Sequence, residues 1–300
     1  MNKYIRRLLE LLLVLVLAVT SYFYEDIEEY IKKYNQESIS TVTSKINNLE
    51  IYYLDVGNAD SILIRYSDKN VLIDAGNNGD GKKLVSYFKS LNISGFDYVI
   101  GTHAHEDHIG GMDDIIDNFS IKHFFMPDVI TTTKTFEDVL DSLKNNNIKF
   151  ETPKIDSNFV VGDLKFKVLY IGDSKEDLND TSIVIKLIYK NTSYLFMGDA
   201  TSNVEKQILD KNLKSDVLKV GHHGSKYSSS AKFLNEVCPK YSIIEVGKNN
   251  DYGHPKDIVL KKLEKIGSKI YRTDNDGTIY LKSDGNDINI EKIKTDTNGG

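Results

Sequence analysis

A cluster of histidines and carboxylates between residues 102 and 111 is the feature that most constrains how this chain can fold. The segment reads THAHEDHIGG and holds three of the seven histidines of the chain. Imidazole nitrogens and carboxylate oxygens suit zinc or manganese. Alternate side chains of an extended segment point the same way, so we expect His103 and His105 to converge on one ion. Asp107 and His108 lie at the turn into a helix and are expected to face a second ion.

Strand and helix patterns alternate from Leu49 to the end of the chain. Short apolar runs such as IYYLDV, SILIRY and NVLIDA predict strands, and GKKLVSYFKSLN predicts a helix. Further strand pairs are predicted around FVVGDLKFKVLY and between SIVIKLIY and TSYLFMGD. This alternation predicts an α/β domain over residues 49–300, built as a layered sandwich with helices outside two central sheets.

The N-terminus has a different character. Three basic residues precede the apolar run Leu8–Tyr24, in which Glu10 is the single charge. A spanning helix needs about 20 mostly apolar residues, and a secretory signal has the same layout. Residues 1–24 are therefore interpreted as a membrane anchor, inserted through residues 5–24, or as a cleaved signal, with the anchor preferred. Both alternatives predict a domain outside the cytosol, either single-pass at the cell membrane or secreted, after a polar tether at residues 25–48.

Charge and cysteine content add limited constraints. The formal net charge of −6 argues against a broad basic surface for gripping nucleic acid. A nucleic-acid substrate is not excluded, because bound cations can supply local positive charge. The single cysteine, Cys238, excludes an intrachain disulfide and is expected to be a buried, small apolar residue.

Eight segments in order resemble the hydrolase domain of the ComEC competence proteins, in the metallo-β-lactamase superfamily. They are LDVGNADSILI, VLIDAG, THAHEDHIGG, LNDTSIVIKL, LFMGDA, LKVGHHGS, YGHP and RTDNDGTI, and the match covers about residues 49–290. The resemblance implies an αβ/βα four-layer sandwich and two divalent metal ions, Zn²⁺ or Mn²⁺. Asn58 and Ala59 depart from the Gln-Gly that the family usually has there. The many membrane helices of ComEC proteins are absent from this sequence, so the chain alone is not expected to build a DNA channel.

The resemblance also carries over a set of site residues. Asp199 matches the aspartate that bridges the two metals. One of His222 and His223 is expected to complete the second metal, with His223 preferred and His222 reaching the substrate. Asp180 stands where many members have a histidine, so it is either an oxygen ligand of the first metal or a turn residue. Asp74 is expected to hold the histidine loop by hydrogen bonds.

The expected catalytic residues are Asp107, His222 and His254. His254, in YGHP, is interpreted as an acid for the leaving group or as a late metal ligand. For Asp55 and Asp60 the sequence leaves two alternatives, a positioning role like that of Asp74 and a purely structural role.

The resemblance implies hydrolysis by a metal-activated hydroxide, which we expect to attack phosphorus. A phosphodiester is the favoured substrate, with single-stranded DNA as the first candidate. Lys219, Lys226 and Lys232 lie near the histidine pair in the sequence as basic residues for such a substrate, and Tyr227 offers a ring for base stacking. The alternatives are a cell-surface phosphocholine or phosphoester hydrolase, a lactamase-like amide hydrolase, and a non-catalytic DNA-binding competence partner. The sequence leaves the oligomeric state open.

Overall fold

The computed structural model describes residues 3–4, 7, 48–173 and 176–294. The chain divides into two units, residues 1–47 and 48–300, and the second unit holds the fold described below. Apart from residues 3–4, 7 and 48, the expected anchor and tether lie outside the described residues. Among the residues that are described, no helix combines the length and the apolar character needed to cross a bilayer.

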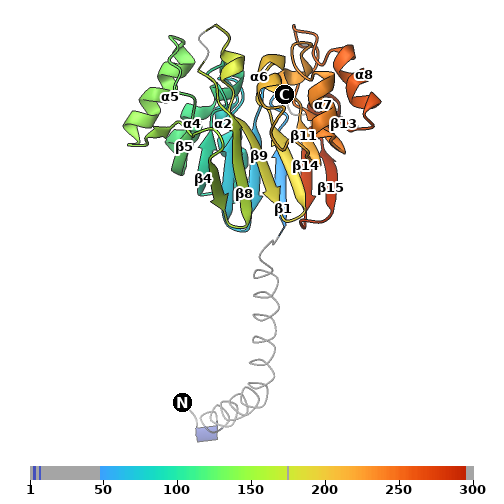
Figure 1. Ribbon diagram of the computed structural model, residues 1–300. Helices are drawn as coiled ribbons and strands as arrows, with labels where there is room; N and C mark the ends of the chain where they lie inside the picture. The colour runs from blue at the N-terminus through green and yellow to red at the C-terminus, as the bar shows by residue number, and fades with distance from the viewer. Residues whose placement is uncertain (1–2, 5–6, 8–47, 174–175, 295–300) are drawn as a thin grey trace. The chain divides into compact units, whose positions relative to one another are not determined.

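Two mixed sheets form the centre of the second unit (Figure 1). The first sheet has the order β15-β14-β1-β2-β3-β4-β5-β6, and the second has the order β13-β12-β11-β10-β9-β8-β7. The strands are β1 (Leu49–Tyr53), β2 (Ile62–Tyr66), β3 (Lys69–Ile73), β4 (Gly95–Ile100), β5 (Ser120–Phe125), β6 (Phe150–Glu151), β7 (Asn158–Val161), β8 (Leu164–Tyr170), β9 (Val184–Tyr189), β10 (Thr192–Phe196), β11 (Val217–Lys219), β12 (Tyr241–Ile244), β13 (Lys269–Arg272), β14 (Thr278–Ser283) and β15 (Ile288–Ile293).

Helices cover the outer faces of both sheets. The set α2, α4 and α5 lies on one side of the sheets, and α7 and α8 lie on the other (Figure 1). The helices are α2 (Gly81–Ser90), α3 (Glu106–Ile109), α4 (Met112–Asn118), α5 (Lys134–Asn145), α6 (Ser202–Gln207), α7 (Ala231–Val237), α8 (Asp257–Lys265) and α9 (Thr273–Asp276), with short 3₁₀ turns η1 (Leu178–Thr181) and η2 (Gly221–Gly224).

Alternation along the strands builds three buried layers. In β1, Ile51 and Tyr53 face the core between the sheets, whereas Tyr52 faces the helices of its own side. In β10, Tyr194 enters the core between the sheets and Leu195 packs under the opposite helices. Because side chains alternate along a strand and both faces are covered, these strands are mostly apolar on both faces, with Glu50 in β1 and Thr192 and Ser193 in β10 as the polar residues. The helix–sheet–sheet–helix arrangement confirms the predicted α/β sandwich.

The strand directions bring several loops to one edge of the sandwich. β3 runs parallel to β4 in the first sheet, and β10, β11 and β12 run parallel in the second. The backbone N–H of Ile183 donates to the carbonyl of Thr102 over 2.9 Å, which joins the two sheets at this edge. The loops that follow these parallel strands carry Asp74, Thr102–Gly111, Asp199, Gly221–Gly224 and Glu245.

The prediction for Cys238 is wrong, because this residue is exposed. It follows α7 in a left-handed conformation, with φ of 47°, and its N–H caps the helix by donating to the carbonyl of Leu234. The turn out of the helix directs the side chain away from the core that Leu234 enters.

Candidate metal centre

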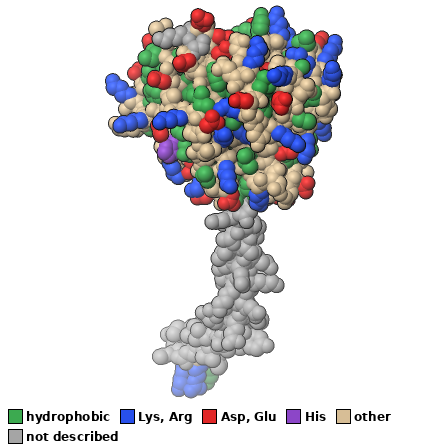
Figure 2. Space-filling view, in the orientation of Figure 1, with side chains coloured by type: hydrophobic (Ala, Val, Ile, Leu, Met, Phe, Trp, Pro, Cys, Tyr) green, Lys and Arg blue, Asp and Glu red, His purple; other side chains and the backbone are tan. Residues whose placement is uncertain are grey.

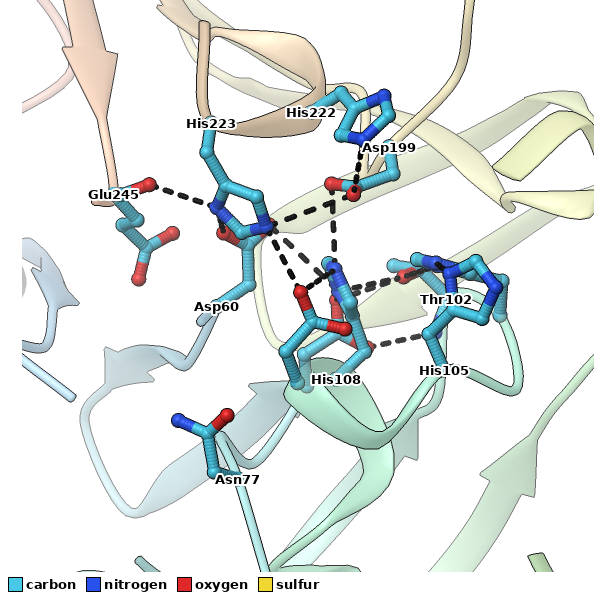
Figure 3. Close-up of polar contacts among 12 residues, drawn as sticks. Asp60, Asn77, Thr102, His105, His108, Asp199, His222, His223 and Glu245 are labelled. Atoms are coloured by element: carbon cyan, nitrogen blue, oxygen red, sulfur yellow. Dashed lines mark hydrogen bonds and ion pairs between the residues drawn. The ribbon is translucent and has the colours of Figure 1, made fainter. Parts of the chain in front are cut away.

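Four side chains from three loops converge at this edge of the sandwich. One ligand atom from each of Asp107, His108, Asp199 and His223 lies within 4.8 Å of the others. Nε2 of His108 is 3.3 Å from Oδ1 of Asp199, and Nε2 of His223 is 3.2 Å from Oδ2 of Asp107. Figure 3 shows His108, His223 and Asp199 pointing toward one another. The structure therefore assembles the residues expected around the second ion, although they are up to 116 positions apart in the chain.

Unsatisfied atoms in this group test whether a metal fits. Nε2 of His108 and Oδ1 of Asp199 are buried and have no hydrogen-bond partner among the described residues. Leaving such atoms unpaired costs about 1–3 kcal/mol each. A divalent cation between them would satisfy both atoms, and two imidazoles with two carboxylates form a donor set that suits zinc or manganese. The residues present therefore fit a divalent metal ion.

His103 and His105 form a second pair of nitrogen donors beside this group. Nε2 of His103 lies 2.9 Å from Nδ1 of His105, and the His103 ring centroid is 4.1 Å from that of His108. Burial, followed by the neighbouring charge of His108, lowers the pKa of His103 well below its usual value. The ring is therefore neutral at pH 7, which is the form that ligates a metal.

Asp74 orients His108 and the loop before it. Its Oδ2 accepts hydrogen bonds from Oγ1 of Thr102 (2.7 Å) and from Nδ1 of His108 (2.8 Å). Its Oδ1 accepts the backbone N–H of Thr102 over 2.8 Å. With Nδ1 engaged, His108 presents Nε2 to Asp199. This is the positioning role expected for Asp74, and such partners set both the tautomer and the ring angle of a ligating histidine.

His223 and His222 take different positions although they are adjacent. Nδ1 of His223 donates to the carbonyl of Glu245 over 2.9 Å, which leaves Nε2 to face Asp107 and Asp199. His222 is farther out, with Nε2 3.7 Å from Oδ2 of Asp199 and a side chain that is 22% exposed. Both residues have positive φ, 54° and 49°, so the chain turns sharply enough to send the two rings in different directions. This geometry favours His223 as the ligand and leaves His222 facing the cleft.

The charges of the group are mutually dependent. Burial raises the pKa of Asp199, but the charges of His223 and His108 outweigh it and hold that pKa well below its usual range. Burial lowers the pKa of His223, but Asp199 and Asp60 raise it to about 9. His223 is therefore protonated at pH 7 in the metal-free protein, and a metal ion must displace that proton to bind.

Comparison with known proteins gives the family. The model for the metallo-beta-lactamase superfamily matches residues 54–247, a span that holds every clustered ligand. The chain belongs to the metallo-β-lactamase superfamily. It is 31% identical over 255 residues to ComE operon protein 3 of Bacillus subtilis, covering 78% of this chain and 33% of that protein. It is 26% identical over 256 residues to competence protein ComA of Neisseria gonorrhoeae, covering 83% and 34% respectively.

The chain spans about a third of the length of these curated relatives. Among solved structures, the metallo-beta-lactamase fold protein YhfI from Bacillus subtilis superposes with a TM-score of 0.55 and 12% identity, covering 78% of this chain and all of that one. This structural likeness shows the fold. The chain therefore has the metal-dependent hydrolase fold of its superfamily and is homologous to competence proteins.

Asp180 does not join the clustered ligand atoms of this metallo-β-lactamase domain. Its two carboxylate oxygens accept from Oγ1 of Thr201 (2.5 Å) and Nδ2 of Asn203 (3.3 Å), next to the start of α6. The neighbouring Asn179 lines the cleft instead. Consecutive side chains of a 3₁₀ turn are about a third of a turn apart, so η1 cannot direct both residues into the site. This geometry favours the turn role for Asp180 over ligation.

His254 lines the cleft beside His222. Their ring centroids are 5.8 Å apart with an interplanar angle of 79°. Burial, followed by the charges of His222 and His223, lowers the pKa of His254 to about 4. At pH 7 the ring is neutral, so it offers a hydrogen bond rather than the readily released proton expected of a leaving-group acid.

One lysine and one acid of this domain lie where the sequence did not predict them. Lys219, expected to face DNA, is fully buried, and its ammonium donates to Oδ2 of Asp60 over 2.5 Å. Asp60 in turn lies 3.4 Å from Nδ1 of His223, which places it in a positioning role. Glu245 is fully buried directly after β12, and its Oε1 accepts the N–H of Ser61 over 3.0 Å. An acid at the end of the apolar run YSIIEV was the available signal for Glu245.

Asp55 lies apart from this network. It is exposed, its N–H donates to Oγ1 of Thr278, and its carboxylate accepts weakly from Gly57. Of its two open interpretations, the structural one fits this position.

Proposed function

We propose that this chain is a dinuclear metal-dependent phosphodiesterase whose substrate is a nucleic acid, with single-stranded DNA as the first candidate. The observation that carries the proposal is the placement of two donor sets side by side, with His105, Asp107, Asp199 and His223 lining one open cleft and His103 buried beside His105. His103 and His105 form one set, and the group around Asp199 forms the other. The cleft has a volume of about 610 Å³, which is ample for a small phosphodiester. Homology to competence proteins supports a DNA substrate.

Bound divalent ions would lower the pKa of a water molecule toward neutrality and polarise the phosphoryl group. The protein supplies orientation. Asp74 and the carbonyl of Glu245 fix the two buried histidines through Nδ1, so both Nε2 atoms face the centre. Burial lowers the pKa of His222, so its neutral ring, which reaches the cleft, would donate a hydrogen bond to a phosphoryl oxygen.

Surface charge is compatible with this proposal but does not provide a broad nucleic-acid platform. Figure 2 shows basic and acidic side chains intermixed over the described part of one face. The favourable potential for a phosphate would therefore come from bound metal ions at the centre rather than from the protein surface.

A cell-surface phosphocholine esterase is the second candidate. Glu106 and Asp251 line the cleft together with Tyr252, and such a lining would attract a cationic leaving group.

We further propose that residues 5–24 anchor the domain at the outer face of the membrane. Protease accessibility on intact cells, compared with lysed cells, tests that location, and protection of the domain in intact cells would contradict it.

The test of the proposed function uses the purified full chain, stripped of metal and reloaded with Zn²⁺ or Mn²⁺. Its substrates are a single-stranded oligonucleotide, a nitrophenyl phosphodiester, a phosphocholine ester and a β-lactam. Asp199→Asn should lose bound metal and at least about 10³-fold in kcat/KM, because it removes a shared ligand charge. Asp287→Asn, an exposed carboxylate in the turn before β15, is the matched control. Full metal content and turnover in Asp199→Asn would refute the site, and a metal-loaded wild type that cleaves no phosphodiester would refute the activity.

A further inference from the structure

An exposed tyrosine lies on one wall of the cleft, in the loop between β12 and α8. Tyr252 is 67% exposed and lines the same cleft as the metal centre. Its ring is nearly parallel to that of His254, with centroids 5.7 Å apart and an interplanar angle of 20°. His254 contacts His222 edge to face, and His222 reaches Asp199. A series of rings therefore leads from the metal centre to the surface.

The loop that carries Tyr252 is held by its own hydrogen bonds. Nδ2 of Asn250 donates to the carbonyls of Gly247 (2.9 Å) and His254 (2.7 Å), and its Oδ1 accepts the N–H of His254 (2.9 Å). The ammonium of Lys256 donates to the carbonyl of Tyr252 over 2.5 Å. These bonds fix the backbone on both sides of an aromatic ring that contributes nothing to the core. A preorganised, exposed ring beside a reactive centre is suited to stacking against a planar ligand.

Uncharged amides accompany this ring in the cleft. Asn58 and Asn179 line the cleft, and the Oδ1 atoms of both are buried without a hydrogen-bond partner among the described residues. Asn77 and Asn249 also line it. A carboxamide both donates and accepts, so this set matches the mixed donors and acceptors on the edge of a nucleobase.

Among the described residues, no lysine or arginine lines this cleft. Of the two lysines between β12 and α8, Lys256 donates to the backbone carbonyl of Tyr252, and Lys248 is exposed but is not among the lining residues. A substrate therefore meets no row of lysines or arginines to follow its phosphates beyond the metal centre. A choline cage would surround its cation with several aromatic faces, whereas Tyr252 is the single Tyr, Phe or Trp among the described lining residues.

We propose that Tyr252 is a platform for one nucleobase next to the scissile phosphate, and that the enzyme grips a single nucleotide rather than tracking a strand. The inference rests on the proposed phosphodiesterase function and names its recognition element. Stacking on Tyr252 and amide contacts from residues such as Asn58 recognise the base. Long polyanionic stretches add little affinity.

Steady-state cleavage of a dinucleotide by the metal-loaded full chain tests this platform. The comparison substrate replaces one base with an abasic tetrahydrofuran, and both nucleotides are tested in turn. Tyr252→Ala removes the ring on which the base stacks, so the KM of this variant for the normal dinucleotide should rise roughly 5- to 150-fold. Tyr252→Phe keeps the ring and should have the wild-type KM. Tyr227→Ala is the control, because Tyr227 is 62% exposed but is not among the residues lining the cleft.

The effects on KM of removing the base and of removing the Tyr252 ring should not be additive. Removing the base and removing the tyrosine together should raise KM no more than either change alone, if the two groups stack on each other. Equal KM values of wild type and Tyr252→Ala on both substrates would overturn the inference. So would a KM that falls steeply with oligonucleotide length, together with a salt dependence that steepens with each added phosphate.

Calorimetric binding of thymidine 5′-monophosphate and of phosphocholine separates this inference from the proposed function. If the wild type cleaves no phosphodiester but binds thymidine monophosphate through Tyr252, the activity is wrong and the platform stands. If phosphocholine binds more tightly, and its binding depends on Tyr252, the platform recognises a cation and the inference is overturned.

Discussion

Replacing Lys219 with methionine should destabilise the protein far more than the loss of a surface lysine. The ammonium and its partner Asp60 have side-chain exposures of 0% and 1%, and Nζ lies 2.5 Å from Oδ2. Burial lowers the pKa of Lys219, but Asp60 and Glu245 outweigh it and raise that pKa, so the lysine is charged at neutral pH. Methionine keeps an unbranched apolar stem and removes the charge. Asp60 then loses its ammonium partner and keeps the more distant imidazoles of His223 (3.4 Å) and His108 (3.9 Å) as its positive neighbours.

The magnitude follows from that geometry. At an effective dielectric constant of about 20, unit charges 2.5 Å apart attract by roughly 7 kcal/mol. Desolvation of both groups offsets part of this attraction, and removing one partner of a buried pair typically costs about 3–5 kcal/mol. We expect Lys219→Met to lower the free energy of unfolding by that amount. The double variant with Asp60→Asn should be less destabilised than Lys219→Met alone, because neither charge is then left unpaired.

Urea unfolding of the metal-free protein at pH 7 measures both effects without linkage to metal binding. Lys186→Met is the matched control. Lys186 is also buried, but its ammonium donates to the backbone carbonyls of Asn212 (2.9 Å) and Lys214 (2.7 Å), so its loss leaves no carboxylate unpaired. Its effect should be smaller and should add to that of Asp60→Asn. The reasoning is refuted if the free energy of unfolding of Lys219→Met is within about 1 kcal/mol of the wild-type value. It is also refuted if adding Asp60→Asn to Lys219→Met lowers that free energy further by the full effect of the single Asp60→Asn change.

Three further predictions concern the histidines. His223→Asn should lose at least about tenfold in metal affinity, whereas His222→Asn should retain metal and lose turnover; equal metal loss in both, measured by dialysis against a chelator, would contradict the assignment. Because the pKa of His223 is about 9 in the metal-free protein, metal binding at pH 7 should release protons, detected by calorimetry in buffers of different ionisation enthalpy, and no buffer dependence would oppose this. The folded-state pKa of His254 is about 4 and its unfolded value is about 6.5, so the unfolded chain binds the extra proton between them. Stability of the metal-free protein should therefore fall as pH drops from about 6.5 toward 4, with a shallower fall in His254→Asn, and identical pH profiles of the two proteins would exclude this contribution.

Local spacing was enough to predict the histidine segment and the strands. His103 and His105 come together as expected, with Nε2 and Nδ1 2.9 Å apart, but the backbone bends at His103 and Ala104, so the extended backbone assumed for this pair is absent. The alternation of apolar residues predicted strands such as β1 and the layered sandwich, because burial on two faces demands it. The metal-ligand roles of Asp199 and His223 were predicted from the family resemblance, because the sequence next to each of them does not indicate that they lie beside Asp107.

Orientation in the turns was not predictable from the same sequence. Asn179 and Asp180 are adjacent, and the 3₁₀ geometry of η1 decides which of them lines the cleft. The sequence around Lys219, with a glycine and two histidines close after it, predicts a solvated lysine. Its burial follows from its position as the last residue of the central strand β11 and from the partner Asp60, which is 159 positions away.

The sequence by itself determined which ligand atoms exist, and it placed them at the ends of predicted strands. The tertiary structure decided which of those atoms share one cavity. Strand order and direction bring together Asp60, Asp107, Asp199 and His223, and that order depends on packing between two sheets rather than on spacing along the chain. For the same reason a charge such as Lys219 becomes part of the interior only when the folded sheets enclose it beside an opposite charge.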